Sequence, residues 1–228
     1  MSRPLLENAS RRWTIAGGLS LIGAPLAFLT GTLIHPGLRS EPSAQLAVIE
    51  SHPDAWYATH LLGLVFVVLM VPAVLTLMRL LGEREPRLSG LGGALALIGL
   101  VGWAGIVAIF GWVFLQMAQS GDRGEMSALF ERVTEEPETV IPTRGLSFLV
   151  VAGMLVLAAA LYRSRLVPRW SPFLIATGFV GFALGAGSEV KALMVASTTA
   201  MTVGLGAIGL TLLGRPKWQP TAPLSEGA

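Results

Sequence analysis

Long apolar runs separated by short polar connections make up most of this chain. Six of them are long enough to form helices, and they cover residues 14–34, 55–81, 90–118, 146–162, 172–186 and 192–213. Charged residues are nearly absent from every face of these runs, whereas a surface helix of a soluble protein keeps a charged face. Crossing the hydrocarbon layer of a membrane takes roughly 20 residues of helix. The pattern therefore predicts an all-α, polytopic membrane protein with six transmembrane helices arranged as three helical hairpins.

The composition agrees with lipid as the surrounding medium. Of the 228 residues, 53% are hydrophobic and only 13% are charged, which is outside the range of soluble globular proteins. We expect a single transmembrane domain over residues 14–213, with a polar N-terminal tail (1–13) and a polar C-terminal tail (214–228). The first run lacks a convincing cleavage site, so we interpret it as an uncleaved helix.

The positive charges are distributed unevenly between the two ends of the predicted bundle. Eleven of the 16 arginines and lysines fall on the tails and on the connections that share their side. Connections rich in arginine and lysine stay in the cytoplasm. Both termini are therefore predicted to be cytoplasmic, and the arginine-rich composition suggests a bacterial cytoplasmic (inner) membrane. The arginines that set this topology are Arg11, Arg12, Arg87, Arg163, Arg165 and Arg169.

An internal repeat is predicted from short matches between the first and second hairpins. The matches are an Arg-x-Ser/Thr-x-x-Gly-Gly motif (12–18 and 87–93), a Ser-Ala pair with proline ten residues after the serine (43–53 and 127–137), and the paired positions His60 and Arg144.

The two longer outer loops carry helical patterns of their own. Pro42 starts one short helix, with Leu46 and Ile49 on one side and Pro53 at its end. In the second loop Met126, Leu129, Phe130 and Val133 form one apolar stripe. These helices could cover the bundle or lie in the membrane interface. The simpler interpretation is that each packs on its own hairpin.

A small polar pocket that faces outward is one hypothesis for function. His60 lies inside the second helix, and ionisable groups within a span are candidates for function. Arg144, Glu189 and Lys191 lie at the same end of the predicted bundle. Trp56 and Tyr57 stand above His60 as an aromatic rim. Such a set could bind a small anion or zwitterion, or relay protons.

The alternative assigns these side chains no ligand. Arg144 and Lys191 would then reach the lipid headgroups, and His60 would make a single hydrogen bond between helices. Similarly, the hydroxyls of the sixth helix, such as Thr198 and Thr202, usually bond to their own helix or join helices. Gly181 and Gly185 indicate close helix packing, within the chain or between copies.

Haem and metal sites have little support, and no cofactor is expected. His35 and His60 are the only histidine pair near a span, so two haems are excluded and a single haem b is the most that could be held. A metal site would need residues of the first outer loop together with His60. That set is Glu50, His52, Asp54 and His60.

Other chemistries are excluded by missing motifs. The chain has no cysteine, no Gly-x-Ser-x-Gly sequence and no phosphate-binding Walker loop. ATP hydrolysis is therefore not expected. The arginines at the helix ends suit anionic lipid rather than nucleic acid. An enzymatic role is not favoured.

The hinge between the fourth and fifth runs carries a family resemblance. Its sequence, Tyr162-Arg163-Ser164-Arg165-Leu166-Val167-Pro168-Arg169-Trp170, leads into a glycine-containing apolar helix. It resembles a family of uncharacterised six-helix bacterial membrane proteins, a domain of unknown function. The resemblance implies the fold and the location, and it brings no catalytic residues.

Three functional hypotheses remain from the sequence. The first is a membrane protein without enzymatic activity that binds or passes a small molecule at the outward-facing pocket. The second is a structural or regulatory subunit that contacts another membrane protein or a second copy of itself. The third is a membrane enzyme that depends on one haem or on a metal.

Overall fold

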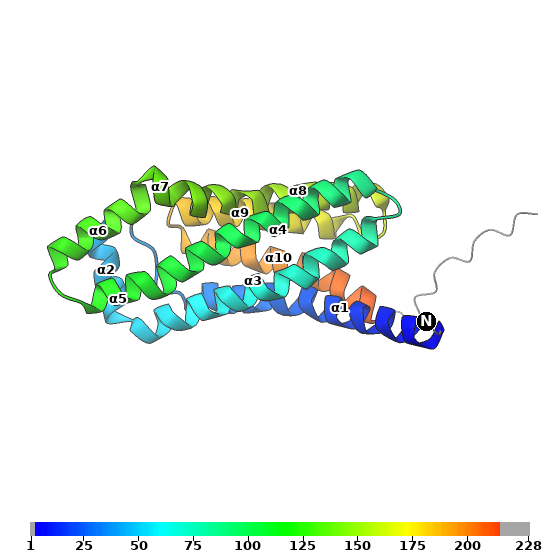
Figure 1. The fold of residues 1–228 in the computed structure, drawn as a ribbon, viewed down its shortest axis with the longest axis horizontal. Helices are drawn as coiled ribbons and strands as arrows, with labels where there is room; N and C mark the ends of the chain where they lie inside the picture. The colour runs from blue at the N-terminus through cyan, green and yellow to red at the C-terminus, as the bar shows by residue number, and fades with distance from the viewer. Residues whose placement is uncertain (1–2, 215–228) are drawn as a thin grey trace, which may run out of the picture.

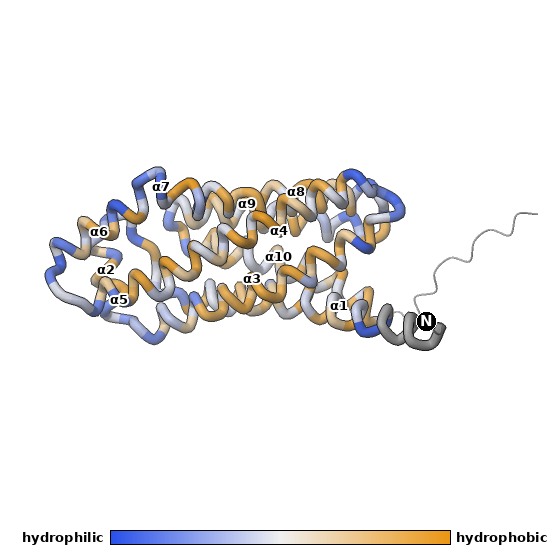
Figure 2. Tube along the Cα trace, in the orientation of Figure 1, coloured by the Kyte–Doolittle hydropathy of each residue, from blue (hydrophilic) through white to orange (hydrophobic). Residues whose placement is uncertain are grey.

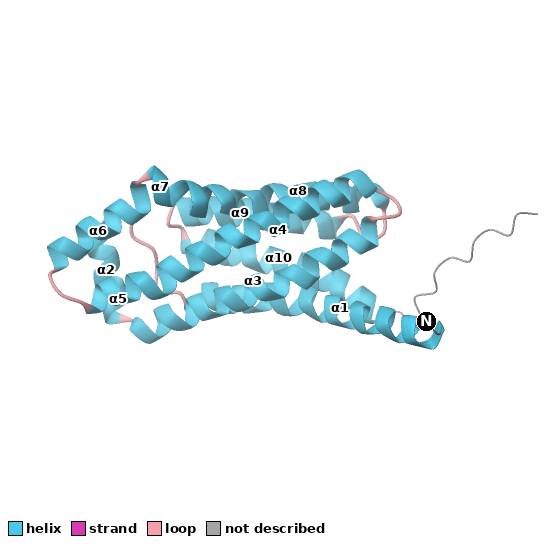
Figure 3. Cartoon of the chain, viewed as in Figure 1, coloured by secondary structure: helices cyan, strands magenta, loops and turns pink. Residues whose placement is uncertain are grey.

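The computed structural model describes residues 3–214, and its side chains from residue 11 onward (Figures 1 and 3). The described chain is helical, with short connections. Its elements are α1 (Arg3–Ile34), α2 (Pro42–Ser51), α3 (Pro53–Leu81), α4 (Pro86–Ala108), the π-helix η1 (Ile109–Val113), α5 (Phe114–Gln119), α6 (Arg123–Glu135), α7 (Pro137–Val140), the π-helix η2 (Ile141–Gly145), α8 (Leu146–Ser164), α9 (Trp170–Gly187) and α10 (Lys191–Leu213).

Six helical stretches are long and apolar enough to cross a membrane, as predicted. They are Arg11–Ile34, Pro53–Leu81, Pro86–Gln119, Pro137–Ser164, Trp170–Gly187 and Lys191–Leu213. Figure 2 shows their apolar middle between two polar ends. The charged groups thus gather where headgroups and water would lie, which is the pattern of a multi-pass membrane protein.

Two predicted boundaries differ from the structure by more than the others do. Helix α1 begins at Arg3, so most of the predicted N-terminal tail continues the first span as helix. The fourth span begins at Pro137 rather than at residue 146 and has 28 residues. Pro142 lies inside this span, in the π-helical turn η2, where the helix continues past the proline. The predicted C-terminal tail lies outside the described residues, apart from Gly214.

The six spans form a closed ring in chain order. Each consecutive pair packs together, with the closest packing between α1 and α3, α4 and α8, and α9 and α10. The ring closes because α10 also packs along α1, where Thr202 donates a hydrogen bond to the backbone oxygen of Pro25 at 3.1 Å. The first and last spans of the chain are therefore neighbours.

Aromatic rings fill the inside of this ring of helices. Phe28 of α1 contacts Phe66 of α3, Trp103 of α4 and Phe182 of α9, with ring centroids 4.5, 5.4 and 4.6 Å apart. Helix α1 has neither α4 nor α9 as a close neighbour in the ring, so these contacts run across the bundle. The middle of the molecule is consequently solid apolar core.

Small residues let some helices approach very closely. A Cβ atom on Gly99 of α4 would lie 2.0 Å from the backbone nitrogen of Val150 in α8. On the facing helix, a Cβ on Gly153 would lie 2.3 Å from the nitrogen of Ala96. Helices within a membrane lack a hydrophobic drive toward one another, so contact of this kind supplies their association.

The short helices of the two outer loops form a joint cap over one end of the bundle. Both predicted helices are present, but α2 packs mainly on α5 and α6 rather than on its own hairpin, which corrects the simpler interpretation. Leu46 and Ile49 of α2 are fully buried in a cluster that also holds Phe114 and Phe130. An ion pair between Glu50 and Arg123 joins α2 to α6. The apolar stripes of the two loops therefore cover each other.

Acidic residues fix the beginnings of both cap helices. The carboxylate of Glu41 accepts hydrogen bonds from the backbone N–H groups of Ser43 and Ala44, and these bonds lower the pKa of Glu41. Asp122 caps α6 in the same way, accepting from Gly124 and Glu125 at 2.7 and 3.1 Å. Such caps satisfy the first N–H groups of a helix, which have no partner inside it.

The opposite end of the bundle holds the basic hinge. Arg163 pairs with Glu85 at 3.1 Å, and Arg84 donates to the backbone oxygen of Ser164 at 3.0 Å, so the α3–α4 and α8–α9 connections are joined. Arg165 adopts a left-handed conformation (φ 55°), which ends α8 and turns the chain toward α9. Arg169 lies over the ring of Tyr162.

Candidate functional site

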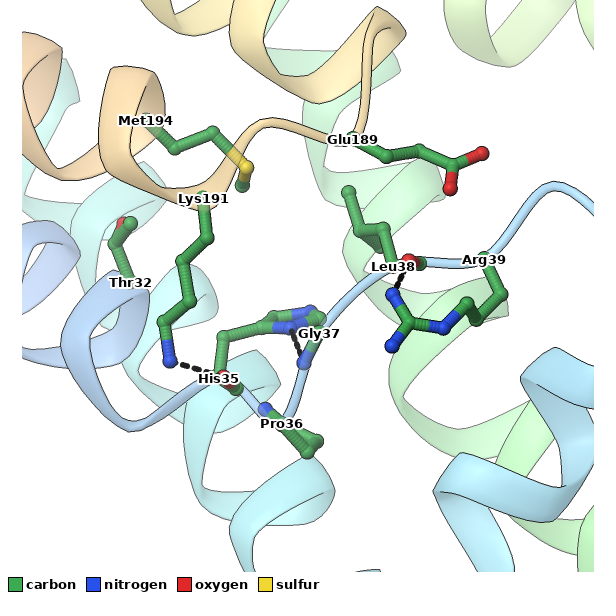
Figure 4. A pocket seen from close by; sticks show the side chains of 9 residues that line it. All are labelled: Thr32, His35, Pro36, Gly37, Leu38, Arg39, Glu189, Lys191 and Met194. Atoms are coloured by element: carbon green, nitrogen blue, oxygen red, sulfur yellow. Dashed lines mark hydrogen bonds between the residues drawn. The ribbon is translucent and has the colours of Figure 1, made fainter.

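A pocket lies at the capped end of the bundle, between the end of α1 and the start of α10 (Figure 4). We call it the mouth pocket. Its volume is about 190 Å³, smaller than the roughly 300–1,000 Å³ of pockets for drug-sized ligands. The residues that line it are Thr32, His35, Pro36, Gly37, Leu38, Arg39, Glu189, Lys191 and Met194.

Two cationic side chains face this pocket. The Nζ of Lys191, the first residue of α10, donates a hydrogen bond to the backbone oxygen of His35 at 2.7 Å. Arg39 folds back on its own loop, with Nη1 donating to the oxygen of Leu38 at 2.9 Å. Its backbone N–H donates to Oε1 of the buried Gln45 in α2 at 2.6 Å, which holds the loop against the cap.

Glu189 supplies the carboxylate of the mouth pocket from the connection between α9 and α10. Its backbone is left-handed (φ 58°), a strained conformation for a residue other than glycine. Within residues 3–214 its carboxylate has no ion pair and no hydrogen bond. Strained residues held in place by their surroundings are concentrated at ligand sites.

Behind the pocket, His35 belongs to a buried aromatic cluster. Its ring lies 5.1 Å from that of Trp56 and 5.8 Å from that of His60, and the Trp56 and His60 rings are 4.6 Å apart. Nδ1 of His35 accepts the N–H of Gly37 at 3.0 Å, whereas Nδ1 of His60 lies 2.8 Å from the backbone oxygen of Trp56. Assigned from these bonds, neutral His35 carries its proton on Nε2 and neutral His60 on Nδ1.

A π-helical turn in the third span shapes this cluster. The turn η1 interrupts the regular helix, and the oxygen of Phe110 accepts a 2.6 Å hydrogen bond from Nε1 of the fully buried Trp56. Beside it, Gly111 makes room for His60, since a Cβ there would lie 2.5 Å from the His60 Cβ. Such turns often occur at functional sites.

Electrostatics keep His35 neutral. His35 follows the last residue of α1 and is 8% exposed. Burial lowers its pKa below the ordinary value, and the nearby His60 and Lys191 lower it further. The pocket therefore presents an uncharged imidazole beside a lysine at neutral pH.

A sequence family covers almost the whole chain. The family described as Domain of unknown function (DUF4386) matches residues 15–214. The chain belongs to this family. No curated protein and no solved structure matches it. The DUF4386 region includes every residue of the mouth pocket, and the expected family resemblance is confirmed.

In this DUF4386 protein the predicted site residues are only partly brought together. Glu189 and Lys191 line the mouth pocket, and His60 lies behind it, next to His35. Trp56 is fully buried rather than standing at a rim, and Tyr57 is exposed against Trp112.

Arg144 lies apart from this group. It is exposed, donates to the backbone oxygen of Thr134 at 3.2 Å, and lies over the ring of Phe110 at 5.8 Å. It thus joins the start of the fourth span to the end of α6.

The pocket also contains residues that the sequence did not single out. Arg39 and the Pro36–Leu38 turn carry no helical pattern. His35, the candidate haem ligand, ends the first apolar run beside this turn and lines the same pocket. A histidine, a proline and an arginine directly after a span were the signal that could have pointed to them.

The structure shows what surrounds the residues that the sequence suggested for a haem or for a metal. A bis-histidine haem needs a flat macrocycle between its two imidazoles, and here the Trp56 ring contacts both His35 and His60. Of the residues considered for a metal, Glu50 pairs with Arg123 and the exposed His52 ring lies by Ser51. Within the described part of the chain, no three His, Asp or Glu side chains gather around a common point.

Proposed function

We propose that this protein binds a small charged molecule in the mouth pocket, at the outer face of a bacterial cytoplasmic membrane. The observation that carries the proposal is the set of charged groups that share one cavity without pairing with one another: Glu189, Lys191 and Arg39. Elsewhere acidic and basic groups that meet do pair, as in Arg163–Glu85. Unpaired charges held around a cavity are the few convergent polar groups that orient a small ligand.

The outward orientation rests on the positive charges. Arginines of the described chain concentrate at the end opposite the pocket, and the connections there hold Arg79, Arg84, Arg87, Arg163, Arg165 and Arg169. Because such connections remain in the cytoplasm, the cap and the mouth pocket would face outward.

Gly181 and Gly185 do not support a role as a subunit that packs on another protein through these glycines. A Cβ on Gly181 would lie 2.4 Å from Oγ of Ser197, and one on Gly185 would lie 2.9 Å from the backbone nitrogen of Met194. Both glycines thus pack on α10 of the same chain. Assembly with a second copy or with another membrane protein remains a separate prediction.

We also propose that the first and second hairpins are copies of each other. Its support is that α2 and α6 occupy the same place in the first and second hairpins, and that an acidic residue caps each of them. A duplicated hairpin explains why two loop helices are available to cover the pocket end.

A cysteine placed in the pocket tests for binding, because the natural chain has none. Leu38→Cys places a thiol on the pocket wall, and Ser120→Cys places one on the exposed α5–α6 connection as a matched control. The rate of maleimide labelling is measured on purified protein with glycine, acetate or methylammonium. We expect at least one probe to slow labelling at residue 38 and none at 120. If no probe slows labelling at 38, the proposed binding of a soluble small molecule is wrong.

A further inference from the structure

The mouth pocket keeps opposite charges separate although they belong to neighbouring residues. Glu189 and Lys191 are two positions apart in the chain, and both line the pocket. No ion pair within 4.0 Å joins them, and none joins Glu189 to Arg39. In Figure 4 the Glu189 side chain extends toward Arg39, while Lys191 points the other way, to His35.

Backbone conformation and one hydrogen bond maintain this separation. The left-handed backbone at Glu189 turns its side chain away from the start of α10. On the other side, the bond from Nζ to the backbone oxygen of His35 holds the Lys191 ammonium at the end of α1. The pocket therefore has an anionic part and a cationic part at fixed places.

The cationic part has donors to spare. An ammonium has three N–H groups, and Lys191 uses one of them in the described chain. Helix α10 also begins here without a side-chain cap, unlike α2 and α6. The N–H groups of its first turn add partial positive charge beside Lys191.

We propose that the ligand of the mouth pocket is a small zwitterion. Its ammonium group binds the carboxylate of Glu189, and its carboxylate or phosphate group binds Lys191 and the start of α10. This inference rests on the proposed function, and it names the ligand class of the same pocket. A simple anion would leave Glu189 unpaired, and a simple cation would leave Lys191 unpaired. Only a zwitterion satisfies both parts.

Two sources supply this chemistry. One is a soluble molecule of amino-acid type, which suits a cavity of about 190 Å³. The other is the headgroup of a zwitterionic phospholipid such as phosphatidylethanolamine, because the pocket lies at the polar end of the six spans. Both present an ammonium group a few bonds from an anionic group.

The first experiment tests a soluble ligand. It compares glycine with acetate and methylammonium, each of which carries one of the two charges of glycine. Maleimide labelling of Leu38→Cys protein is measured against rising concentrations of glycine, acetate and methylammonium. We expect glycine to protect the thiol at roughly tenfold lower concentration than either half, because it gains a second charged contact. Protection by acetate or by methylammonium at the same concentration as glycine would overturn the zwitterion and leave a pocket for a single charge.

Variants of the charged residues assign the two ends of the ligand. In Glu189→Gln protein, glycine should protect no better than acetate. In Lys191→Gln protein it should protect no better than methylammonium, and Lys191→Arg should keep most of the preference. Glu189→Gly provides a second variant that folds readily, because glycine adopts the left-handed backbone without strain. Glu131→Gln, on the exposed face of α6, is the control. An unchanged preference in both Glu189 variants contradicts the assignment.

The lipid arm uses nanodiscs in place of detergent. If the headgroup is the ligand, labelling of Leu38→Cys is slower in phosphatidylethanolamine discs than in phosphatidylglycerol discs, and Glu189→Gln removes the difference. Glycine protection in detergent with equal labelling in the two kinds of disc assigns a soluble zwitterion. Equal labelling in the discs without protection by glycine overturns the inference.

Discussion

At the residue scale, the hydrogen bond between Trp56 and Phe110 shows how the site depends on an irregular helix. The bond is 2.6 Å long and buried, and its acceptor lies inside the π-helical turn η1. It fixes the indole that contacts both His35 and His60. The indole that packs against both imidazoles is thus held by this one carbonyl group.

Trp56→Phe should destabilise the protein by about 1–3 kcal/mol, because the buried Phe110 oxygen loses its donor. The measurement is thermal unfolding in detergent. Trp112→Phe is the control, since within the described chain Trp112 contacts Tyr57 by its ring alone. Equal melting temperatures for the two variants would show that the hydrogen bond contributes little.

Sequence patterns located some site residues and not others, for physical reasons. His60, Glu189 and Lys191 were recognisable because polar groups within or beside spans are rare. Arg39 was not, because a loop without periodicity gives no sign of what it folds against. Arg144 was paired with His60 by the repeat, but it follows the proline of η2, and a π turn shifts the helical face by about 100° for the extra residue.

At the scale of elements, the contact between α4 and α8 depends on the absence of side chains. Gly99 and Gly153 face the backbone of the other helix at distances that no Cβ tolerates. The apolar runs predicted that these two helices exist. How closely their backbones approach could be seen only in the structure. The continuation of the fourth span to Pro137 was likewise hidden, because a proline and charged residues are typical of loops.

Gly99→Ala should destabilise the protein by about 1–3 kcal/mol or more, because its methyl group forces the two backbones apart. Gly90→Ala in the same helix is the matched control, since nothing lies within 4 Å of its added Cβ. The control should gain up to about 1 kcal/mol from higher helix propensity. Thermal unfolding in detergent distinguishes them, and equal melting temperatures would contradict the close contact.

At the scale of the whole molecule, the structure has two chemically different ends. One end carries the cap (Figure 1) and the mouth pocket (Figure 4), and the other carries the arginine hinge. The number of spans could be predicted from hydropathy alone, since lipid demands continuous apolar helix. The cap over the pocket could not, because it depends on two loops packing against each other.

Single cysteines test the predicted orientation in intact cells. Ser40→Cys lies at the capped end and Glu83→Cys at the hinge end, and both positions are exposed. A membrane-impermeant maleimide should label residue 40 in intact cells and residue 83 only after permeabilisation. The reverse pattern would place the mouth pocket in the cytoplasm.

The packing of α10 on α1 has a consequence for biosynthesis. Helix α1 is synthesised before α10 and packs along it, and a Cβ on Gly209 would lie 2.6 Å from the backbone oxygen of Gly18. Until α10 is made, the face of α1 that holds Gly18 and Pro25 lacks its protein partner. A chain that stops after α9 therefore leaves this face of α1 without a protein partner. Exposure of that face lets cellular proteases distinguish unfinished copies from finished ones.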